Sequence, residues 1–434
     1  MKTTLVIFGI TGDLAQRKLL PALANVIEAD QASELTIIGV SRRAVEQYQV
    51  LGDHQQLSGT TSMLQMDLDN PEDYQKLRTY IAQTDDEQVL FYLSVPPESA
   101  SGIVENLGKA GMNGQHNKLL LEKPFGRDLA SAQAMIDHTA EYFHESQIYR
   151  IDHYLAKEMA QNIVTFRARN AIFSYLWSNE YIERIEVIAL ESIGIEGRTS
   201  FYEQTGALRD IVQGHLLQLL ALTLAPLPGE LNWDSLPTRR MAALDAITTV
   251  NPTKAVRAQY DTYRQEVGNP ESLVETFVSV ELESSDPSWT GVPLALTTGK
   301  SLDRKKTEVR VHFRRMNDTQ SNYLIFKIQP DEGIAIDLVT KKPGYDMDVE
   351  HQKLSYMYPA DQRLPDAYEQ VLVDAMNSRK SLFATSGEVL RAWEILAPLQ
   401  QAWSSKTDIA TYTSGMNAAA VISEATQSNQ QQTT

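Results

Sequence analysis

Short apolar runs alternate with longer amphipathic stretches over about the first 150 residues of the chain. The clearest apolar runs are Leu5–Phe8, Leu35–Val40, Val89–Val95 and Leu119–Leu121, and a helical pattern covers Asp13–Ala29. Strands and helices that alternate in this way are typical of a parallel sheet with helices on both faces. This part of the chain is therefore predicted to be an α/β domain.

A different pattern begins after Ile182. Apolar and polar residues alternate with a period of two in Ile185–Leu190, Thr276–Leu282, Glu308–Phe313 and Tyr323–Ile328. Such runs suit antiparallel strands with one face in water. The second part of the chain is therefore predicted to be α+β.

Together the two patterns predict a protein of class α/β followed by α+β. We expect a Rossmann-like domain in residues 1–149 and a larger α+β domain, with a big and mainly antiparallel sheet, in residues 150–434. The chain has 434 residues, which is enough for both domains at roughly 150 residues per domain.

Charge and cysteine content exclude several classes of function. The chain has 39 basic and 56 acidic residues, a formal charge of -17, so its field repels nucleic acid and anionic membranes. It contains no cysteine, which excludes disulfides, thiolate metal sites and cysteine nucleophiles and fits a reducing compartment. We expect a cytoplasmic protein that binds neither nucleic acid nor membrane and holds no metal.

A glycine motif, Gly9-Ile-Thr-Gly12-Asp13, directly follows the first apolar run. Glycines at this point let the backbone turn tightly and approach a pyrophosphate, whose charge is stabilised by the N-terminus of the next helix. The spacing differs from the usual G-x-G-x-x-G, so an ordinary loop in which Asp13 caps the helix explains this stretch equally well.

Two arginines, Arg42 and Arg43, end the second apolar run. Folds specific for NAD commonly place an acidic residue here, on the ribose hydroxyls. Arginine suits a 2′-phosphate instead, so the pair favours NADP. A solvated pair of surface arginines is the alternative.

One lysine, Lys123, stands at the end of the run Leu119–Leu121 and immediately before a proline. The residue before proline is disfavoured in a helix, which places Lys123 at the carboxyl edge of the sheet, where ligands bind. An ordinary surface lysine is the alternative.

Polar residues are densest in the segment from Asp152 to Lys157. If a helix begins near Asp152, His153 and Lys157 stand four positions apart on one face with Tyr154 beside them. Their donors would then converge on a phosphate. A plain amphipathic helix with a satisfied histidine is the alternative.

A histidine, His215, lies in an apolar helical pattern that begins near Gly206. For a lone histidine among leucines, a buried structural role is the alternative to a role as base. Asp210 is five positions away, about 140° around an ideal α-helix, so a carboxylate that orients His215 should come from another segment.

Over nearly its whole length the sequence resembles the glucose-6-phosphate dehydrogenase family. The most specific matches are Glu122-Lys-Pro-Phe-Gly126, Arg150-Ile-Asp-His-Tyr-Leu-Ala-Lys-Glu158 and Asp210-Ile-Val-Gln-Gly-His-Leu-Leu-Gln218. The resemblance implies an NADP-dependent oxidoreductase that converts glucose 6-phosphate to 6-phosphoglucono-1,5-lactone, the first step of the oxidative pentose phosphate pathway. It also implies that residues 150–434 bind the substrate and form a homodimer or homotetramer.

The resemblance assigns roles to individual residues. His215 would be the general base that takes the C1 hydroxyl proton, and Asp152 would orient it. The residues that would bind the substrate are Lys123, His153, Tyr154, Lys157, Glu191, Asp210 and Lys300. The residues that would bind the cofactor are Gly9, Thr11, Gly12, Asp13, Lys18, Arg42, Arg43 and Lys123.

The chain departs from the family's pattern at Ala156, Gly214 and Thr297, where glycine, asparagine and arginine are expected. Two alternatives therefore stay open. A related sugar dehydrogenase with a different substrate would have no need of phosphate ligands when its sugar is neutral. A non-catalytic paralogue that binds NADP or a sugar phosphate would have no need of a proton acceptor.

Overall fold

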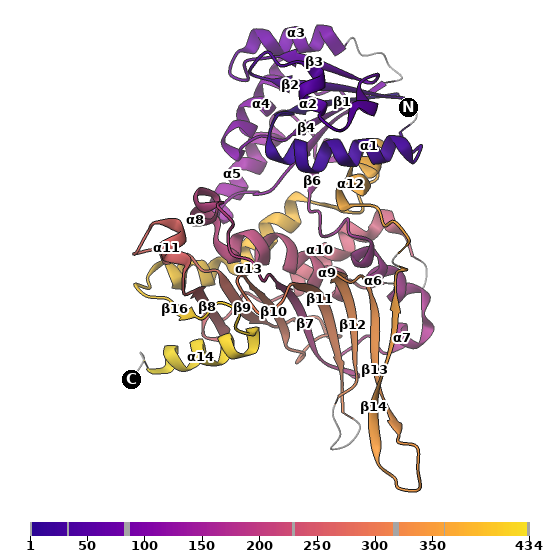
Figure 1. The fold of residues 1–434 in the computed structure, drawn as a ribbon, viewed down its shortest axis with the longest axis vertical. Coiled ribbons are helices and arrows are strands. Elements are labelled where there is room, and N and C mark those ends of the chain that lie inside the picture. Colours follow the sequence, from indigo (N-terminus) through magenta and orange to yellow (C-terminus); the bar gives the residue numbers. More distant parts are fainter. Residues whose placement is uncertain are drawn as a thin grey trace. The chain divides into compact units, whose positions relative to one another are not determined.

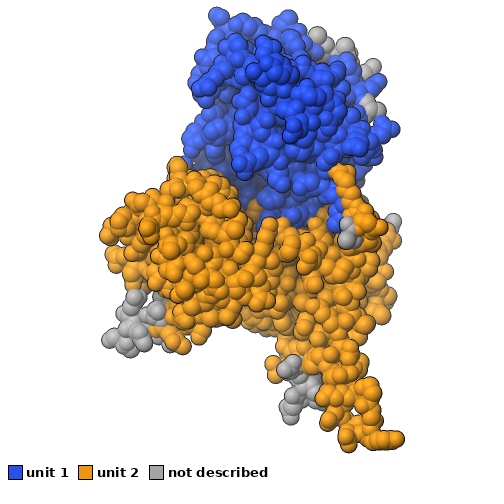
Figure 2. Space-filling view, viewed as in Figure 1, with its two compact units in different colours: residues 1–157, 233–237, 364–390 blue, residues 158–232, 238–363, 391–434 orange. Residues whose placement is uncertain are grey.

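The computed structural model describes residues 2–32, 34–81, 87–227, 231–315, 321–359 and 361–431. The chain divides into two units, each built around its own sheet (Figures 1 and 2). Unit 1 contains residues 1–157, 233–237 and 364–390, and unit 2 contains residues 158–232, 238–363 and 391–434. The predicted division into 1–149 and 150–434 differs from this in two respects. Unit 1 continues to residue 157, and it also includes two later segments.

Unit 1 has a seven-stranded sheet in the order β15-β6-β5-β4-β1-β2-β3. Its strands are β1 (Lys2–Phe8), β2 (Leu35–Ser41), β3 (Thr61–Gln65), β4 (Glu87–Leu93), β5 (Asn117–Leu121), β6 (Ile148–Ile151) and β15 (Phe383–Ala384). Its helices are α1 (Leu20–Glu28), α2 (Gln47–Leu51), α3 (Pro71–Ile81), α4 (Pro97–Lys109), α5 (Leu129–Ala140) and α12 (Ala367–Met376), with the short segments η1 (Ala15–Leu19), η2 (Gln55–Leu57), η3 (Glu145–Gln147) and η5 (Trp233–Ser235).

Strands β1 to β6 pair in parallel, which confirms the predicted α/β architecture. The central strands are apolar throughout because helices cover the sheet; Val6, Ile7 and Phe8 of β1, for example, are all 0% exposed. Helix α1 packs beside α12, and α4 packs against both α3 and α5.

The segment 364–390 joins unit 1 through contacts that are distant in sequence. Its strand β15 pairs antiparallel with β6. The Asn25 amide donates to the Glu369 carboxylate over 2.9 Å. Lys118 Nζ donates to the carbonyl of Ala375 over 2.6 Å and to the hydroxyl of Ser378 over 2.7 Å. These contacts fasten the segment 364–390 to the strands β5 and β6 and to the helix α1.

A buried lysine, Lys118, and a half-buried one, Lys380, predict how the stability of unit 1 changes at alkaline pH. Lys118 is 7% exposed and also donates to the Gln88 side-chain oxygen over 2.6 Å. Burial lowers the pKa of Lys118 to about 8, and burial also lowers the pKa of Lys380 to about 8. Unfolded lysines titrate near 10.5, so between pH 8 and 10.5 the unfolded chain binds more protons than the folded chain. The free energy of unfolding should therefore increase with pH in this window.

For Lys118 the increase is on the order of 3 kcal/mol. Above pH 10 a second effect opposes it, because burial raises the pKa of tyrosines such as Tyr149, to about 12, and unfolded tyrosines ionise first. The melting temperature should rise from pH 8 to pH 10, and it should rise less in Lys118→Met. An equal rise in parent and variant would contradict this account.

Unit 2 has a nine-stranded sheet in the order β14-β13-β12-β11-β7-β10-β9-β8-β16. Its strands are β7 (Ile182–Leu190), β8 (Ala255–Tyr260), β9 (Phe277–Leu282), β10 (Leu294–Gly299), β11 (Lys306–Phe313), β12 (Tyr323–Gln329), β13 (Gly333–Lys341), β14 (Val349–Met357) and β16 (Ala410–Tyr412). Its helical segments are α6 (Glu158–Arg169), α7 (Ala171–Tyr175), α8 (Thr199–Ala207), η4 (Leu208–Leu216), α9 (Leu217–Leu224), α10 (Leu236–Ala246), η6 (Pro252–Lys254), α11 (Tyr263–Val267), α13 (Ser386–Ser404) and α14 (Ala418–Gln431), and α10 and α13 begin in residues of unit 1.

Most neighbouring strands of the second sheet are antiparallel, as predicted, and the pairs β7/β10 and β8/β16 are parallel. The hairpin of β13 and β14 extends beyond the other strands of this sheet (Figure 1). Among the described residues, no helix combines the length and apolar content needed to cross a membrane.

Candidate active site

The glycine loop after β1 has room only for glycine at its first position. Gly9 has a φ of +80°, and a Cβ there would lie 2.3 Å from the Ser94 carbonyl oxygen. The Gly12 N–H donates to the Gly9 carbonyl over 2.9 Å, which closes the turn. Thr11 and Asp13 are exposed at the start of the helix that follows. A turn without side chains at Gly9 and Gly12, beside a helix N-terminus, lets the pyrophosphate of a dinucleotide approach the backbone.

Charged side chains near this loop make only weak contacts. Asp13 Oδ1 lies 2.7 Å from Arg17 Nε, and both side chains are more than three-quarters exposed. Lys18 Nζ lies 3.7 Å from Asp366 Oδ2, and both are about half exposed. Exposed pairs of this kind contribute roughly 0–1 kcal/mol, so a ligand phosphate can compete for these cations.

Arg42 and Arg43 directly follow β2 and are both exposed. The Arg43 N–H donates to the Ser41 hydroxyl over 3.2 Å, which holds the start of this loop. The two guanidinium groups are therefore accessible at the carboxyl end of the second strand, as the sequence predicts.

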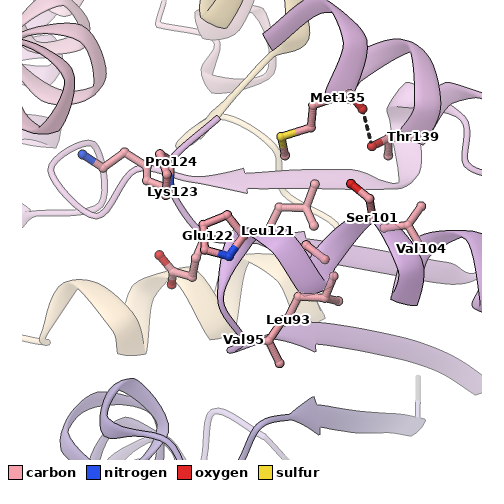
Figure 3. A pocket seen from close by; sticks show the side chains of 12 residues that line it. Leu93, Val95, Ser101, Val104, Leu121, Glu122, Lys123, Pro124, Met135 and Thr139 are labelled. Atoms are coloured by element: carbon pink, nitrogen blue, oxygen red, sulfur yellow. Dashed lines mark hydrogen bonds between the residues drawn. The ribbon is translucent and has the colours of Figure 1, made fainter. Parts of the chain in front are cut away.

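Lys123 lies at the carboxyl edge of the sheet, on the loop after β5 (Figure 3). It lines, with Glu122 and residues of α4 and α5, a cavity of about 30 Å³, which is large enough for a water molecule. The Tyr92 hydroxyl, at the end of β4, donates to the Glu122 carboxylate. Burial raises the pKa of Glu122 to about 7, although this hydrogen bond and the Lys123 charge act in the opposite direction. Glu122 is therefore an ionisable group beside Lys123 for which the sequence predicted no role.

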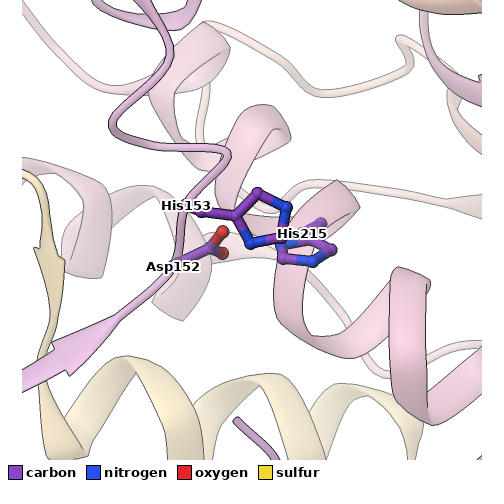
Figure 4. A group of neighbouring side chains, drawn as sticks. All are labelled: Asp152, His153 and His215. Carbon is purple, nitrogen blue, oxygen red and sulfur yellow. The ribbon is translucent and has the colours of Figure 1, made fainter. Parts of the chain in front are cut away.

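Asp152 begins a turn and not a helix. The prediction of a helix that starts near Asp152 is therefore wrong, and α6 begins only at Glu158. Asp152 Oδ1 accepts the Tyr154 N–H over 2.9 Å, and the Asp152 carbonyl accepts the Leu155 N–H over 3.1 Å. Such side-chain bonds to nearby backbone compete with helix formation. Asp152 is only 2% exposed, and it lies beyond the end of β6 (Figure 4).

The turn nevertheless gathers the three residues predicted to bind phosphate. The rings of His153 and Tyr154 are 5.0 Å apart, and Lys157 Nζ lies 5.9 Å from the Tyr154 ring centroid. Tyr368 of α12 stacks on His153 with ring centroids 6.0 Å apart. A lysine, a histidine and two tyrosines that lie this close together offer donors that suit an anionic group. Tyr368 could not be placed here from the sequence, because no local pattern connects α12 to this turn.

In unit 2, Glu191 and Lys300 directly follow the parallel strands β7 and β10. The Glu191 N–H donates to the Gly299 carbonyl over 2.9 Å, which keeps the two strand ends in register. Lys300 is 3% exposed; its Nζ forms an ion pair with the Glu191 carboxylate and lies 5.5 Å from the Tyr202 ring centroid. The structure therefore brings these two predicted sugar-binding residues together.

Asp210 and His215 both lie on η4, which is a π-helix. In this geometry the N–H of each residue bonds to the carbonyl five positions earlier, as Leu217 does to Val212. The expectation that Asp210 lies about 140° away from His215 is therefore wrong, because it assumed an α-helix. His215, drawn in Figure 4, is 2% exposed, whereas Asp210 is partly exposed. The pKa of Tyr202 is raised first by the burial of its hydroxyl and next by the negative charge of Asp210.

The predicted site residues thus fall into two groups, one in each unit. Unit 1 carries Gly9, Thr11, Gly12, Asp13, Lys18, Arg42, Arg43, Lys123, Asp152, His153, Tyr154 and Lys157. Unit 2 carries Glu191, Asp210, His215 and Lys300. The pairing of Asp152 with His215 involves both units and stays a prediction.

Two family models together match nearly the whole chain. The one described as "Glucose-6-phosphate dehydrogenase, NAD binding domain" matches residues 6–162. The one described as "Glucose-6-phosphate dehydrogenase, C-terminal domain" matches residues 164–433.

Individual proteins show the same similarity. The glucose-6-phosphate 1-dehydrogenase of Bacillus subtilis is 35% identical to this chain, and the alignment covers 95% of this chain and 94% of that protein. That of Chlamydia muridarum is 33% identical, over 92% of this chain and 90% of its own. The crystal structure of glucose-6-phosphate 1-dehydrogenase from Mycobacterium avium has a TM-score of 0.86 at 30% identity, over 96% of both chains. A glucose-6-phosphate dehydrogenase in complex with its substrate glucose 6-phosphate has a TM-score of 0.91 at 26% identity, over 98% of this chain and 97% of that one.

Proposed function

Because this chain belongs to the glucose-6-phosphate dehydrogenase family, we propose that it oxidises glucose 6-phosphate at C1 and transfers the hydride to NADP. The product is 6-phosphoglucono-1,5-lactone. The observation that carries this proposal is the cluster of His153, Tyr154 and Lys157 with Tyr368, because a dehydrogenase for a neutral sugar has no use for it.

In the proposed reaction His215 takes the proton of the C1 hydroxyl while the C1–H bond breaks and the C1–O bond becomes a carbonyl. The nicotinamide, when bound, accepts the hydride. Asp152 holds the imidazole in the orientation that accepts the proton and stabilises the imidazolium that forms. A proton, a hydride and the lactone account for all the atoms of the oxidation.

The remaining residues position the two ligands. His153, Tyr154 and Lys157 hold the 6-phosphate, and Glu191 and Lys300 bind sugar hydroxyls with their paired charges. Phosphate lies far from C1, so its binding energy serves to orient the reacting carbon.

A cross of two substrates with two cofactors tests the function. Reduced cofactor formation is measured with glucose 6-phosphate or glucose and with NADP or NAD. We expect kcat/KM to be highest for glucose 6-phosphate with NADP, and we expect the preference for the phosphorylated sugar to fall in Lys157→Ala. Equal turnover of both sugars would favour a related sugar dehydrogenase. Cofactor binding without turnover of any pair would favour a non-catalytic paralogue.

The preference for NADP should depend on Arg42 and Arg43. A charge-assisted guanidinium–phosphate contact contributes on the order of 1.5–3 kcal/mol, about one to two powers of ten in affinity. The double variant Arg42→Ala and Arg43→Ala should lose most of the ratio of kcat/KM for NADP over NAD, while kcat with NADP changes little. A parent protein that uses both cofactors equally well would contradict the assignment.

The proposal also includes a homodimer or homotetramer in the cytoplasm. Support for self-association comes from the hairpin of β13 and β14, which exposes Val349, Leu354 and Tyr356 by 53%, 58% and 54%. An edge strand that exposes three apolar side chains among polar ones can pair with a second copy of the chain. Light scattering measures the mass of the assembly. The proposed location in the cytoplasm is supported by the absence of cysteine, which fits a reducing compartment.

A further inference from the structure

Glu275, two residues before β9, contacts the beginning of the helix that carries Asp210 and His215. The Ala207 N–H donates to the Glu275 main-chain carbonyl over 2.9 Å. The Leu208 N–H donates to Glu275 Oε1 over 3.0 Å. The first backbone donors of η4 would otherwise lack partners, as at any helix start. Glu275 therefore caps η4 from a segment that is 67 residues distant from Leu208 in the sequence.

The chain bends sharply at this cap. Gly206 has φ 64° and ψ 176°, which separates α8 from η4. A Cβ at Gly206 would lie 2.6 Å from Glu275 Oε1 and 2.9 Å from its Cδ. The carboxylate is thus packed against a bend that accepts only glycine, and its position and the start of η4 depend on each other.

The surroundings of Glu275 hold its carboxylate in place as an acceptor for the Leu208 N–H. Glu275 is 6% exposed, and burial raises its pKa, whereas the Leu208 N–H and the positive charges of Arg209 and Arg257 act in the opposite direction. A negative side chain at a helix N-terminus is also favoured by the helix dipole. The hydrogen bond from the Leu208 N–H is therefore the contact through which the side chain holds the cap.

The next residue, Thr276, contacts the other predicted sugar-binding element. The Lys300 N–H donates to the Thr276 carbonyl over 3.0 Å. The Thr276 and Tyr412 hydroxyls are 3.1 Å apart, and the Tyr412 hydroxyl donates to the Lys300 carbonyl over 2.5 Å. Two consecutive residues thus hold the start of η4 and the end of β10.

We propose that Glu275 is a positioning residue for turnover: with Thr276 it fixes the helix of Asp210 and His215 relative to Lys300. The proposal rests on the function proposed above. In this proposal Glu275 acts through the helix that it caps and not through a contact with either ligand. A displacement of about 1 Å at the base can reduce turnover by ~10²-fold, so a cap that sets the helix start affects kcat more than binding.

The test compares Glu275→Met, which removes the acceptor at similar length, with Glu275→Gln, whose amide oxygen can still accept the Leu208 N–H. Glucose 6-phosphate oxidation with NADP should show kcat lowered by about 10–100-fold in Glu275→Met, with KM for both ligands changed by less than about threefold. Glu275→Gln should stay within about threefold of the parent kcat. Glu275→Asp, whose side chain is one methylene shorter, should have a kcat between those of the other two variants. It replaces Glu275→Met in the comparison if Glu275→Met does not fold.

Glu203 provides a matched control in the same unit. Its carboxylate accepts from the hydroxyls of Tyr263 and Ser272 over 2.6 and 2.7 Å and does not cap η4. Glu203→Met should lower the melting temperature but leave kcat near the parent's. A Glu275→Met protein with parental kcat, or equal losses in Glu275→Met and Glu275→Gln, would overturn the inference. A parent protein inactive on glucose 6-phosphate would refute the proposed function instead.

Discussion

Replacing His215 by asparagine should lower kcat by ~10²–10⁴-fold and leave KM for glucose 6-phosphate nearly unchanged. Hydride cannot leave C1 unless the hydroxyl proton is removed, and asparagine fills a similar space but accepts no proton at neutral pH. Steady-state kinetics on the purified variant measure both parameters.

A structural role of His215 predicts a different result. The side chain is 2% exposed on an apolar helix, so loss of packing alone would lower the melting temperature. His312 is a suitable control because it is a histidine of the same unit, bonded to Glu186 over 2.9 Å. His312→Asn should retain parental kcat. Near-full kcat in His215→Asn would show that the base lies elsewhere.

Asp152→Asn should fall in the same kinetic class, with kcat lowered by ~10²–10⁴-fold. The asparagine oxygen can still accept the Tyr154 N–H, now bonded to Asp152 Oδ1 over 2.9 Å, so the turn should persist. What is lost is the negative charge that orients and stabilises the imidazolium. Adding Asp152→Asn to His215→Asn should cost little more than His215→Asn alone, because residues that act as a unit are not additive.

The π-helix makes Asp210 a direct competitor for the orienting role. It stands five residues from His215, the spacing of hydrogen-bonded residues in η4. The same double-variant cycle with Asp210→Asn separates the two carboxylates. Strictly additive losses for Asp152 and His215, together with non-additive losses for Asp210 and His215, would assign the role to Asp210.

Much of the fold could be predicted because the signals are local. Buried strands such as β1 and β4 are continuous apolar runs, and β7, β9, β11 and β12 follow the two-residue period. The strand β3, Thr-Ser-Met-Leu-Gln, carries neither pattern and was not predicted. The segment 364–390 belongs to unit 1 through side chains such as Lys118, which form no pattern along the chain.

The candidate site shows the same limit. The local pattern indicated Lys123, which follows an apolar run, and the dense polar segment with His153, Tyr154 and Lys157. Glu191 and Lys300 were assigned only by the resemblance to the family. The turn at Asp152 was mistaken for a helix because spacing alone does not reveal a side chain that bonds its own backbone. Glu275 was missed because a helix cap provided by a distant segment has no local signature.

Transfer of an isotope from substrate to cofactor would show that the protein moves a hydride from C1 of glucose 6-phosphate to NADP. Glucose 6-phosphate that carries deuterium at C1 is incubated with NADP and the unmodified protein, and the products are analysed by NMR. The account predicts 6-phosphoglucono-1,5-lactone, or its hydrolysis product, and reduced cofactor with deuterium at C4 of the nicotinamide. Reduced cofactor without deuterium, or no reaction with this substrate, would contradict it.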